Sequence, residues 1–135
     1  MKFHIELFAD YWDKAPQVKV DINNDVIWDV TVTDNKTIEH EKEILNKEKI
    51  KLNIILYGKT DDQTIIENEK VIKDQLLHIK NIEIDDVEIE DLIWEAEYTV
   101  NTGIKKRVIT LGENGTWCLT FTSPFYLWLL ERQTW

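Results

Sequence analysis

The chain has 135 residues, a length that fits one domain and can bury a substantial core, so we expect a single domain over residues 1–135. Twenty-six acidic side chains against sixteen Lys and Arg give a formal net charge of −10. This charge repels phosphate backbones and anionic headgroups, which argues against binding of nucleic acid or a membrane surface. The lone cysteine, Cys118, excludes an internal disulfide framework. Residues 1–9 begin directly with an alternating pattern, so we expect no signal peptide.

The residue types favour strands over helices. The chain contains 18 Ile, 9 Val and 12 Thr but only 3 Ala, and β-branched side chains fit a pleated, half-buried surface better than a helix. Only four glycines are available for tight turns. We therefore expect a mainly β protein in which Asn and Asp adopt the left-handed turn conformations that glycine often supplies.

Alternating apolar and polar residues mark the strands in the first half of the chain. They predict a strand over residues 2–9, a polar and aromatic loop over 10–16, and a β-hairpin over 18–32. Residues 37–44 fit either a helix or a strand. We favour the strand, because the next run, 50–56, alternates plainly and a short turn separates the two.

The second half continues in the same way. Short runs around residues 65–72 predict a small hairpin within a long polar loop, and further strands are expected over 77–84, 94–100 and 116–122. The parity of the apolar positions changes at Asp85 and Asp86, which indicates a tight turn there. About ten short strands separated by polar turns predict an all-β sandwich of the jelly-roll type.

The chain ends in a strongly apolar segment. Ser123 and Pro124 are typical of a helix start, with serine as the cap and proline in the first position. Residues 125–130 are apolar on every side, so we expect a short helix or turn that is buried in the protein's own core or against a partner. The residues predicted to bind a partner are Phe125, Tyr126, Trp128 and Trp135.

Two aromatic residues stand in a charged loop after the first strand. The chain has six tryptophans, and aromatic faces pack against sugar rings as well as against other apolar groups. Tyr11 and Trp12 can therefore either cover one end of the sandwich or bind a ligand. We predict them as the ligand-binding pair.

Acidic loop residues are the candidates for metal binding. Carboxylate oxygens suit calcium, and Asp61 and Asp62 lie together in a polar loop, where Asp74 can approach from the returning strand. The alternative is that these side chains only form turn hydrogen bonds. No EF-hand spacing is present.

Catalytic residues are not evident in the sequence. The three histidines lie in or beside strand patterns, and no arrangement of nucleophile and base or glycine-rich phosphate loop is found. We therefore predict a non-enzymatic protein, with a small hydrolase as the remaining alternative.

The negative charge is concentrated in one stretch. Residues 81–98 hold eight acidic side chains and no Lys or Arg, whereas residues 105–107 are Lys, Lys and Arg. Such runs are usually solvated faces, but an acidic hairpin beside a basic edge can also orient a protein against a partner.

Three segments, 18–26, 51–62 and 76–89, resemble the early hairpin and the central motif of the calcium-dependent xylan-binding carbohydrate-binding modules. The resemblance covers about the middle half of the chain and implies a jelly-roll fold. It also implies calcium-assisted binding of a polysaccharide, with Tyr11 and Trp12 as the stacking platform. The chain departs from that family at Asp85 and Asp86, where the modules usually have a glycine.

The whole chain, with its ending over residues 115–130, also looks like small proteins of tailed bacteriophages that infect cyanobacteria. This resemblance implies a structural or decoration protein of the virion, made in the host cytoplasm. Its partners would be other virion proteins or further copies of the chain, and its outer face could bind a glycan. Because the modules are normally appended to enzymes, we favour the virion role and keep the carbohydrate-binding module as the alternative.

Overall fold

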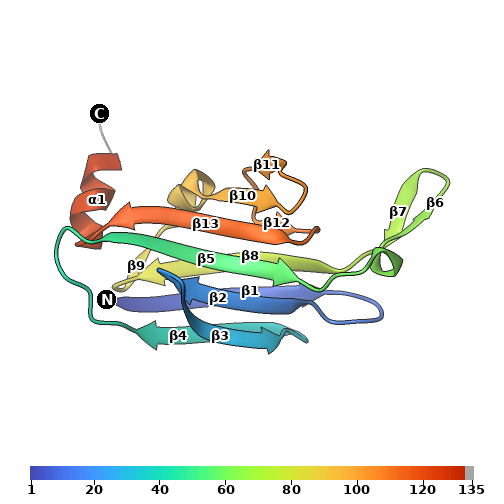
Figure 1. Cartoon of the computed structure of the whole chain (residues 1–135), viewed down its shortest axis with the longest axis horizontal. Helices are drawn as coiled ribbons and strands as arrows, with labels where there is room; N and C mark the ends of the chain where they lie inside the picture. Colours follow the sequence, from blue (N-terminus) through green and yellow to red (C-terminus); the bar gives the residue numbers. More distant parts are fainter. Residues whose placement is uncertain (133–135) are drawn as a thin grey trace.

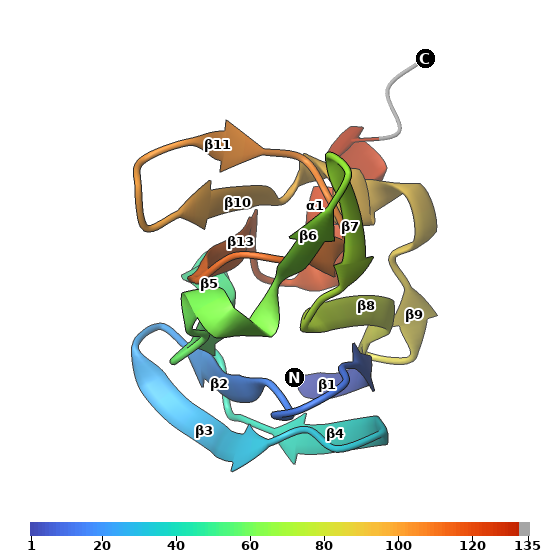
Figure 2. The same ribbon diagram turned by 90° about the vertical axis from the view of Figure 1, so that its right-hand side faces the viewer.

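The computed structural model describes residues 1–132, and over residues 90–92 it describes the backbone alone. Two large antiparallel sheets pack face to face (Figures 1 and 2). The first, sheet A, has the strand order β12 (Thr110–Leu111), β8 (Leu76–Ile84), β1 (Lys2–Asp10) and β4 (Asn35–Glu41), with β9 (Val87–Glu88) also paired to β8. The predicted all-β sandwich is therefore confirmed.

Sheet B has six strands. Their order is β11 (Lys105–Lys106), β10 (Glu97–Val100), β13 (Gly115–Thr122), β5 (Lys49–Tyr57), β2 (Gln17–Ile22) and β3 (Asp25–Thr31). A separate two-stranded hairpin, β6 (Ile65–Glu67) and β7 (Lys70–Lys73), projects from one end of the sandwich (Figure 1). Two 3-10 turns, η1 (Asp61–Gln63) and η2 (Glu90–Glu95), and one helix, α1 (Phe125–Arg132), complete the described chain.

The core lies between the two sheets, as the alternating patterns predict. In β1 and β5 every second side chain is buried, and the residues between them face outward. Trp117, on β13, is fully buried in this core. At about 25 cal/mol per Å² of apolar surface removed from water, this burial is the main stabilising contribution to the fold.

Tight turns without glycine join several of the strands. The residue pairs Asn23–Asn24, Asn68–Glu69 and Asp85–Asp86 all have positive φ, between 51° and 70°. Two successive positive φ values are the geometry of the type I′ turn, which matches the twist of a β-hairpin. The predicted turn at Asp85 and Asp86 is thus confirmed, and Glu69 takes a conformation that is more usual for Asn or Gly.

The ambiguous segment after β3 is a strand. β4 pairs with β1 along its whole length, so the helical interpretation of residues 37–44 is wrong. The strand ends at Glu41, earlier than the sequence pattern indicates.

The helix α1 covers one end of the core but is not buried on every side. Phe125 and Trp128 are buried and pack on Phe121, with ring centroids 5.3 to 6.0 Å apart. Tyr126, in contrast, is 60% exposed, because a short helix lying on the end of a sandwich presents only one stripe to it. Phe125 and Trp128 therefore belong to the protein's own core and are not available to a partner. Trp135 lies outside the described residues.

Ser123 attaches the helix to the loop between β4 and β5. Its hydroxyl accepts a hydrogen bond of 3.0 Å from the Glu48 main-chain N–H and donates one to the Leu45 carbonyl. The hydroxyl thus bonds to a distant loop, and no helix-capping bond from it is found among the described contacts. No helix in residues 1–132 is long and apolar enough to span a membrane.

The packing of α1 predicts that a buried and an exposed aromatic residue of this helix contribute differently to the stability of the protein. We expect Trp128→Ala to lower the free energy of unfolding by about 3–5 kcal/mol, the usual result of emptying a buried aromatic site. Tyr126→Ala, the matched exposed control, should change it by less than about 0.5 kcal/mol. Denaturant unfolding of both variants measures this, and equal effects would show that α1 is not docked as described.

Candidate functional site

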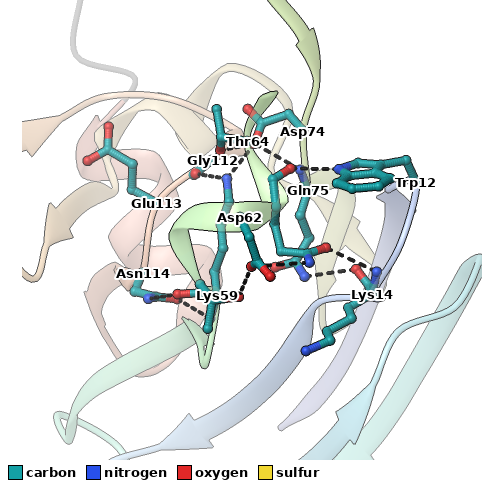
Figure 3. Close-up of polar contacts among 12 residues, drawn as sticks. Trp12, Lys14, Lys59, Asp62, Thr64, Asp74, Gln75, Gly112, Glu113 and Asn114 are labelled. Atoms are coloured by element: carbon teal, nitrogen blue, oxygen red, sulfur yellow. Dashed lines mark hydrogen bonds and ion pairs between the residues drawn. The ribbon is translucent and has the colours of Figure 1, made fainter. Parts of the chain in front are cut away.

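The strongest candidate site lies at the end of the sandwich from which the β6–β7 hairpin projects. Three segments distant in sequence meet there: the loop after β1, the chain from the end of β5 through η1, and the residues that join β7 to β8 (Figure 1). The loop between β12 and β13 approaches the same region. Polar side chains connect all four segments (Figure 3).

Gln63 fixes the loop that carries the aromatic pair. This side chain is only 1% exposed. Its main-chain oxygen accepts a 2.8 Å bond from the Trp12 indole N–H, and its amide oxygen accepts a 3.0 Å bond from the Lys14 main-chain N–H. Its amide nitrogen donates to Asp13, and Gln75 donates to the Lys14 carbonyl (Figure 3). Trp12 is therefore held in one orientation by the residues beneath it.

An ion pair between Lys59 and Asp74 lies at the centre of the site. The Lys59 Nζ is 2.5 Å from an Asp74 carboxylate oxygen and donates to the Gly112 carbonyl. The same carboxylate oxygen accepts bonds from the Thr64 hydroxyl at 2.7 Å and the Gln75 main-chain N–H at 2.8 Å. The Lys59 side chain is 8% exposed and that of Asp74 22%. The pair thus joins the end of β5 to both β7–β8 and the β12–β13 loop.

The same contacts keep Asp74 ionised. Burial alone would raise the pKa of its carboxyl group, but the bonds from Lys59, Thr64 and Gln75 outweigh burial and hold the pKa below its ordinary value of 3.8. At neutral pH Asp74 is therefore a hydrogen-bond acceptor that carries a negative charge.

Asn114 adds a second connection across the site. Its amide oxygen accepts from the Lys59 main-chain N–H and its amide nitrogen donates to the Lys59 carbonyl, both at 2.9 Å. This two-way contact substitutes for strand pairing at the point where β5 ends.

A groove of about 340 Å³ opens beside Trp12, and we call it the Trp12 groove. Trp12 is 43% exposed, and the Lys73 ammonium lies 4.9 Å from the centre of its ring. Val71 and Ile72 on β7 form an exposed apolar wall. The groove is lined by Asp10, Tyr11, Trp12, Val71, Ile72, Lys73, Asp74 and Leu76. The groove thus combines an aromatic ring and branched aliphatic side chains with carboxylate groups that can accept hydrogen bonds.

The two members of the predicted aromatic pair differ in their surroundings. Tyr11 is half-buried and packs against the hydrophobic core, so it covers this end of the sandwich. Trp12 is the more exposed residue and faces the groove. Tyr11 therefore both covers this end of the sandwich and lines the groove, whereas Trp12 provides the more exposed aromatic surface.

The predicted metal ligands do not fit a calcium site. Asp74 binds the Lys59 ammonium, and Asp62 accepts hydrogen bonds from the Thr60 hydroxyl and the Gln63 amide. Among the side chains that the structure describes, no three acidic, histidine or cysteine residues are grouped so that they could hold a metal ion. Asp61, Asp62 and Asp74 are therefore not grouped as one ligand set, and Asp74 is instead paired with Lys59.

The basic edge, residues 105–107, forms its contacts within the chain. Glu97 pairs with Lys105 at 3.4 Å, and Lys106 pairs with Glu113 at 3.0 Å. Arg107 donates to main-chain oxygens of η2. The three basic residues of this edge are thus bound within the chain, whereas only Glu97 of the eight acidic side chains takes part in these contacts.

A larger hollow of about 620 Å³ lies on the outer face of sheet A, around His4. The His4 ring nitrogens are 3.1 to 3.7 Å from carboxylate oxygens of Glu6, Glu39 and Glu83. Partial burial would lower the pKa of His4, but the bonds to Glu6 and Glu39 and the charge of Glu83 together raise it above 6.5. The residues that line this hollow include four carboxylates, two histidines and one lysine. None of them presents an exposed aromatic face.

Comparison of the sequence with known proteins finds no match, whereas comparison of the structure finds a similar fold. No family model and no curated protein matches the sequence. A solved structure described as "vCBM60 in complex with galactobiose" is similar, with a TM-score of 0.56 and 8% sequence identity over 87% of this chain and 96% of that one. The fold is therefore that of a carbohydrate-binding-module-like β-sandwich.

The central ion pair predicts a pH-dependent effect of Asp74→Asn. This change leaves the Lys59 ammonium nearly buried without a counter-charge, so we expect a loss of about 2–3 kcal/mol at pH 7, less than for a fully buried pair. Because the folded-state pKa of Asp74 lies below 3.8, its contribution is complete above pH 3.8 and disappears as the pH falls through the folded-state value. The difference from the unmodified protein should therefore narrow as the pH falls below 3.8.

Denaturant titrations across this pH range measure the effect. Glu97→Gln, which removes one partner of an exposed ion pair, is the control and should change stability by less than about 1 kcal/mol at pH 7. An Asp74→Asn effect that is absent at pH 7, or that does not diminish as the pH falls below 3.8, would contradict the assignment.

Proposed function

We propose that this protein binds carbohydrate in the Trp12 groove. The observation that carries the proposal is the fixed indole: Trp12 is exposed to solvent, yet its N–H is bound to Gln63 and its loop is held by two buried glutamines. An exposed aromatic side chain is usually free to change rotamer. One that is held in place loses little entropy when a flat ligand packs on it.

The groove has the chemistry that a sugar requires. The C–H groups on one face of a pyranose ring pack on an aromatic face, and the apolar wall of β7 lies beside it. Hydroxyl groups need acceptors and donors, which Asp10, Asp74 and Lys73 supply along the same groove. The carbohydrate-binding-module-like fold supports the same conclusion, since the similar structure is described as a complex with galactobiose.

We propose binding without catalysis. Lys59 keeps the pKa of Asp74 low, so this carboxyl group cannot supply a proton near neutral pH as a glycosidase acid does. None of the three histidines lines the Trp12 groove.

A calorimetric titration tests the proposal. We expect the protein to bind a soluble neutral polysaccharide from a panel of galactan, xylan and mixed-linkage glucan, and Trp12→Ala to weaken this binding at least tenfold, about 1.4 kcal/mol. Because the acidic residues do not fit a calcium site, a chelator should leave the affinity unchanged.

Trp94→Ala is the matched control for this experiment. Trp94 is 46% exposed, almost the same as Trp12, but lies in η2, away from the groove. The Trp94→Ala variant should bind the polysaccharide with the same affinity as the unmodified protein. No heat with any of the three polysaccharides, or equal losses in the two variants, would contradict the proposal.

The virion role stays a second proposal. It needs a surface for protein contacts, and the outer side of α1 offers one, since Tyr126, Leu127 and Leu130 are 47% to 60% exposed. Location on a phage particle rests on the sequence resemblance, and no curated phage protein matches the chain.

Self-association through α1 has a direct test. If this face joins copies of the chain, sedimentation velocity should detect a dimer or larger species, and the double substitution Leu127→Glu and Leu130→Glu should return it to monomer. Leu45→Glu, at a 74% exposed leucine in the β4–β5 loop, is the control and should leave the assembly intact. A monomer for the unmodified protein at all concentrations would remove self-association through this helix.

A further inference from the structure

A second hollow lies directly beside the Trp12 groove, and we call it the Tyr98 hollow. It has a volume of about 330 Å³, and Asp74 and Leu76 line both the groove and the hollow. Tyr98, Lys106, Thr110 and Glu113 form most of its other side. The two depressions thus meet at the carboxylate that the Lys59 ion pair fixes in place.

Tyr98 brings an unused hydroxyl group to this hollow. The side chain is 1% exposed, and its oxygen is buried without a hydrogen-bond partner among the described residues. A buried hydroxyl without a partner is unfavourable, and most such groups in proteins are paired. Within the described residues this hydroxyl group is therefore open to a water molecule or to a ligand from outside the chain.

The hydroxyl group is a donor in the neutral pH range. Burial, and secondarily the negative charge of Glu113, raise the pKa of Tyr98 well above its ordinary value of 10. The main-chain N–H of Glu113 lies near enough to oppose this shift, but it forms no hydrogen bond with the Tyr98 oxygen within the usual geometric limits. The proton therefore stays on Tyr98 and is free to be donated.

The polar groups above Tyr98 can yield to a ligand. Lys106 and Glu113 form a 3.0 Å ion pair, but their side chains are 40% and 51% exposed. Exposed pairs of this kind contribute little stability, so displacing this one costs little. Lys106 in the hollow already faces Glu113, and Lys59 beside it faces Asp74. This balance leaves no excess positive charge for an anionic ligand.

We propose that the Tyr98 hollow is a second subsite of the carbohydrate site, which receives the sugar unit next to the one packed on Trp12. The inference rests on the proposed function. The neighbouring unit is neutral, it accepts a hydrogen bond from Tyr98, and it passes over Asp74 to reach the hollow. The site therefore selects chains of at least two sugar units over single sugars.

The test is a calorimetric series of ligands of increasing length. Galactose, xylose and glucose are titrated first, followed by the disaccharide, trisaccharide and tetrasaccharide of each. We expect the affinity of the unmodified protein to rise about tenfold or more from the monosaccharide to the trisaccharide of the series that binds. We expect Tyr98→Phe to bind that trisaccharide only about as tightly as the monosaccharide.

Two further variants separate the subsite from changes in folding. Thr110→Trp places a bulky side chain in the hollow at an exposed position and should remove the same gain in affinity. Tyr57→Phe removes a hydroxyl group that is bonded to Asp29 on the outer face of sheet B, and it should keep the full dependence on chain length. Thermal unfolding of Tyr98→Phe should show no loss of stability, because the lost hydroxyl has no partner within the described chain.

The results distinguish the subsite from the function on which it rests. If the monosaccharide binds as tightly as the tetrasaccharide, or if Tyr98→Phe keeps the gain with length, the second subsite is refuted while carbohydrate binding stands. If the unmodified protein binds no member of the three series, both are overturned together.

Discussion

Lys59 and Asp74 form an ion pair at the end of the sandwich where four chain segments meet without regular strand pairing. In water such a pair would contribute little, but Lys59 is nearly buried and the Asp74 carboxylate accepts two further hydrogen bonds. An uncompensated charge in this position would be strongly unfavourable. The geometry of β7, the β12–β13 loop and both hollows therefore depends on these two side chains remaining together.

This arrangement explains how an acidic protein can offer a defined binding surface. The net charge of −10 excludes many partners, yet Lys59 and Lys106 are each paired with an acid, and Lys73 adds a positive charge beside Asp10 and Asp74 in the groove. A fixed indole beside balanced polar groups suits a neutral ligand that carries many hydroxyl groups. The same lysine that orders the site also pairs with Asp74, one of the three predicted calcium ligands.

The sequence was sufficient to predict the sandwich because strand periodicity is a local signal. The alternation of Phe3, Ile5 and Leu7 directly indicates which face of β1 is buried. The paired turn residues, such as Asp85 and Asp86, likewise show where a hairpin closes. At the C-terminus the pattern was less informative, because six consecutive apolar residues do not reveal which stripe of a helix meets the core.

The candidate site was only partly predictable. Trp12 was identifiable as an aromatic residue in a charged loop, but its partners were not. Gln63 bonds residues about fifty positions earlier, and Lys59 bonds Gly112, so no local pattern connects them. A single buried glutamine or lysine produces no repeating pattern in the sequence, so its burial is visible only in the folded structure. For Asp74, proximity to Asp61 and Asp62 in the sequence suggested a metal, whereas the fold supplies a lysine.

The most direct test of carbohydrate binding at Trp12 is the NMR signal of its indole N–H, which the bond to Gln63 fixes in position. During titration with a binding polysaccharide fragment, the account predicts that this signal shifts progressively with those of residues 71–76. The indole signals of Trp94 and the buried Trp117 should stay in place. Shifts confined to other faces of the sandwich, with the Trp12 signal unmoved at saturation, would contradict the account.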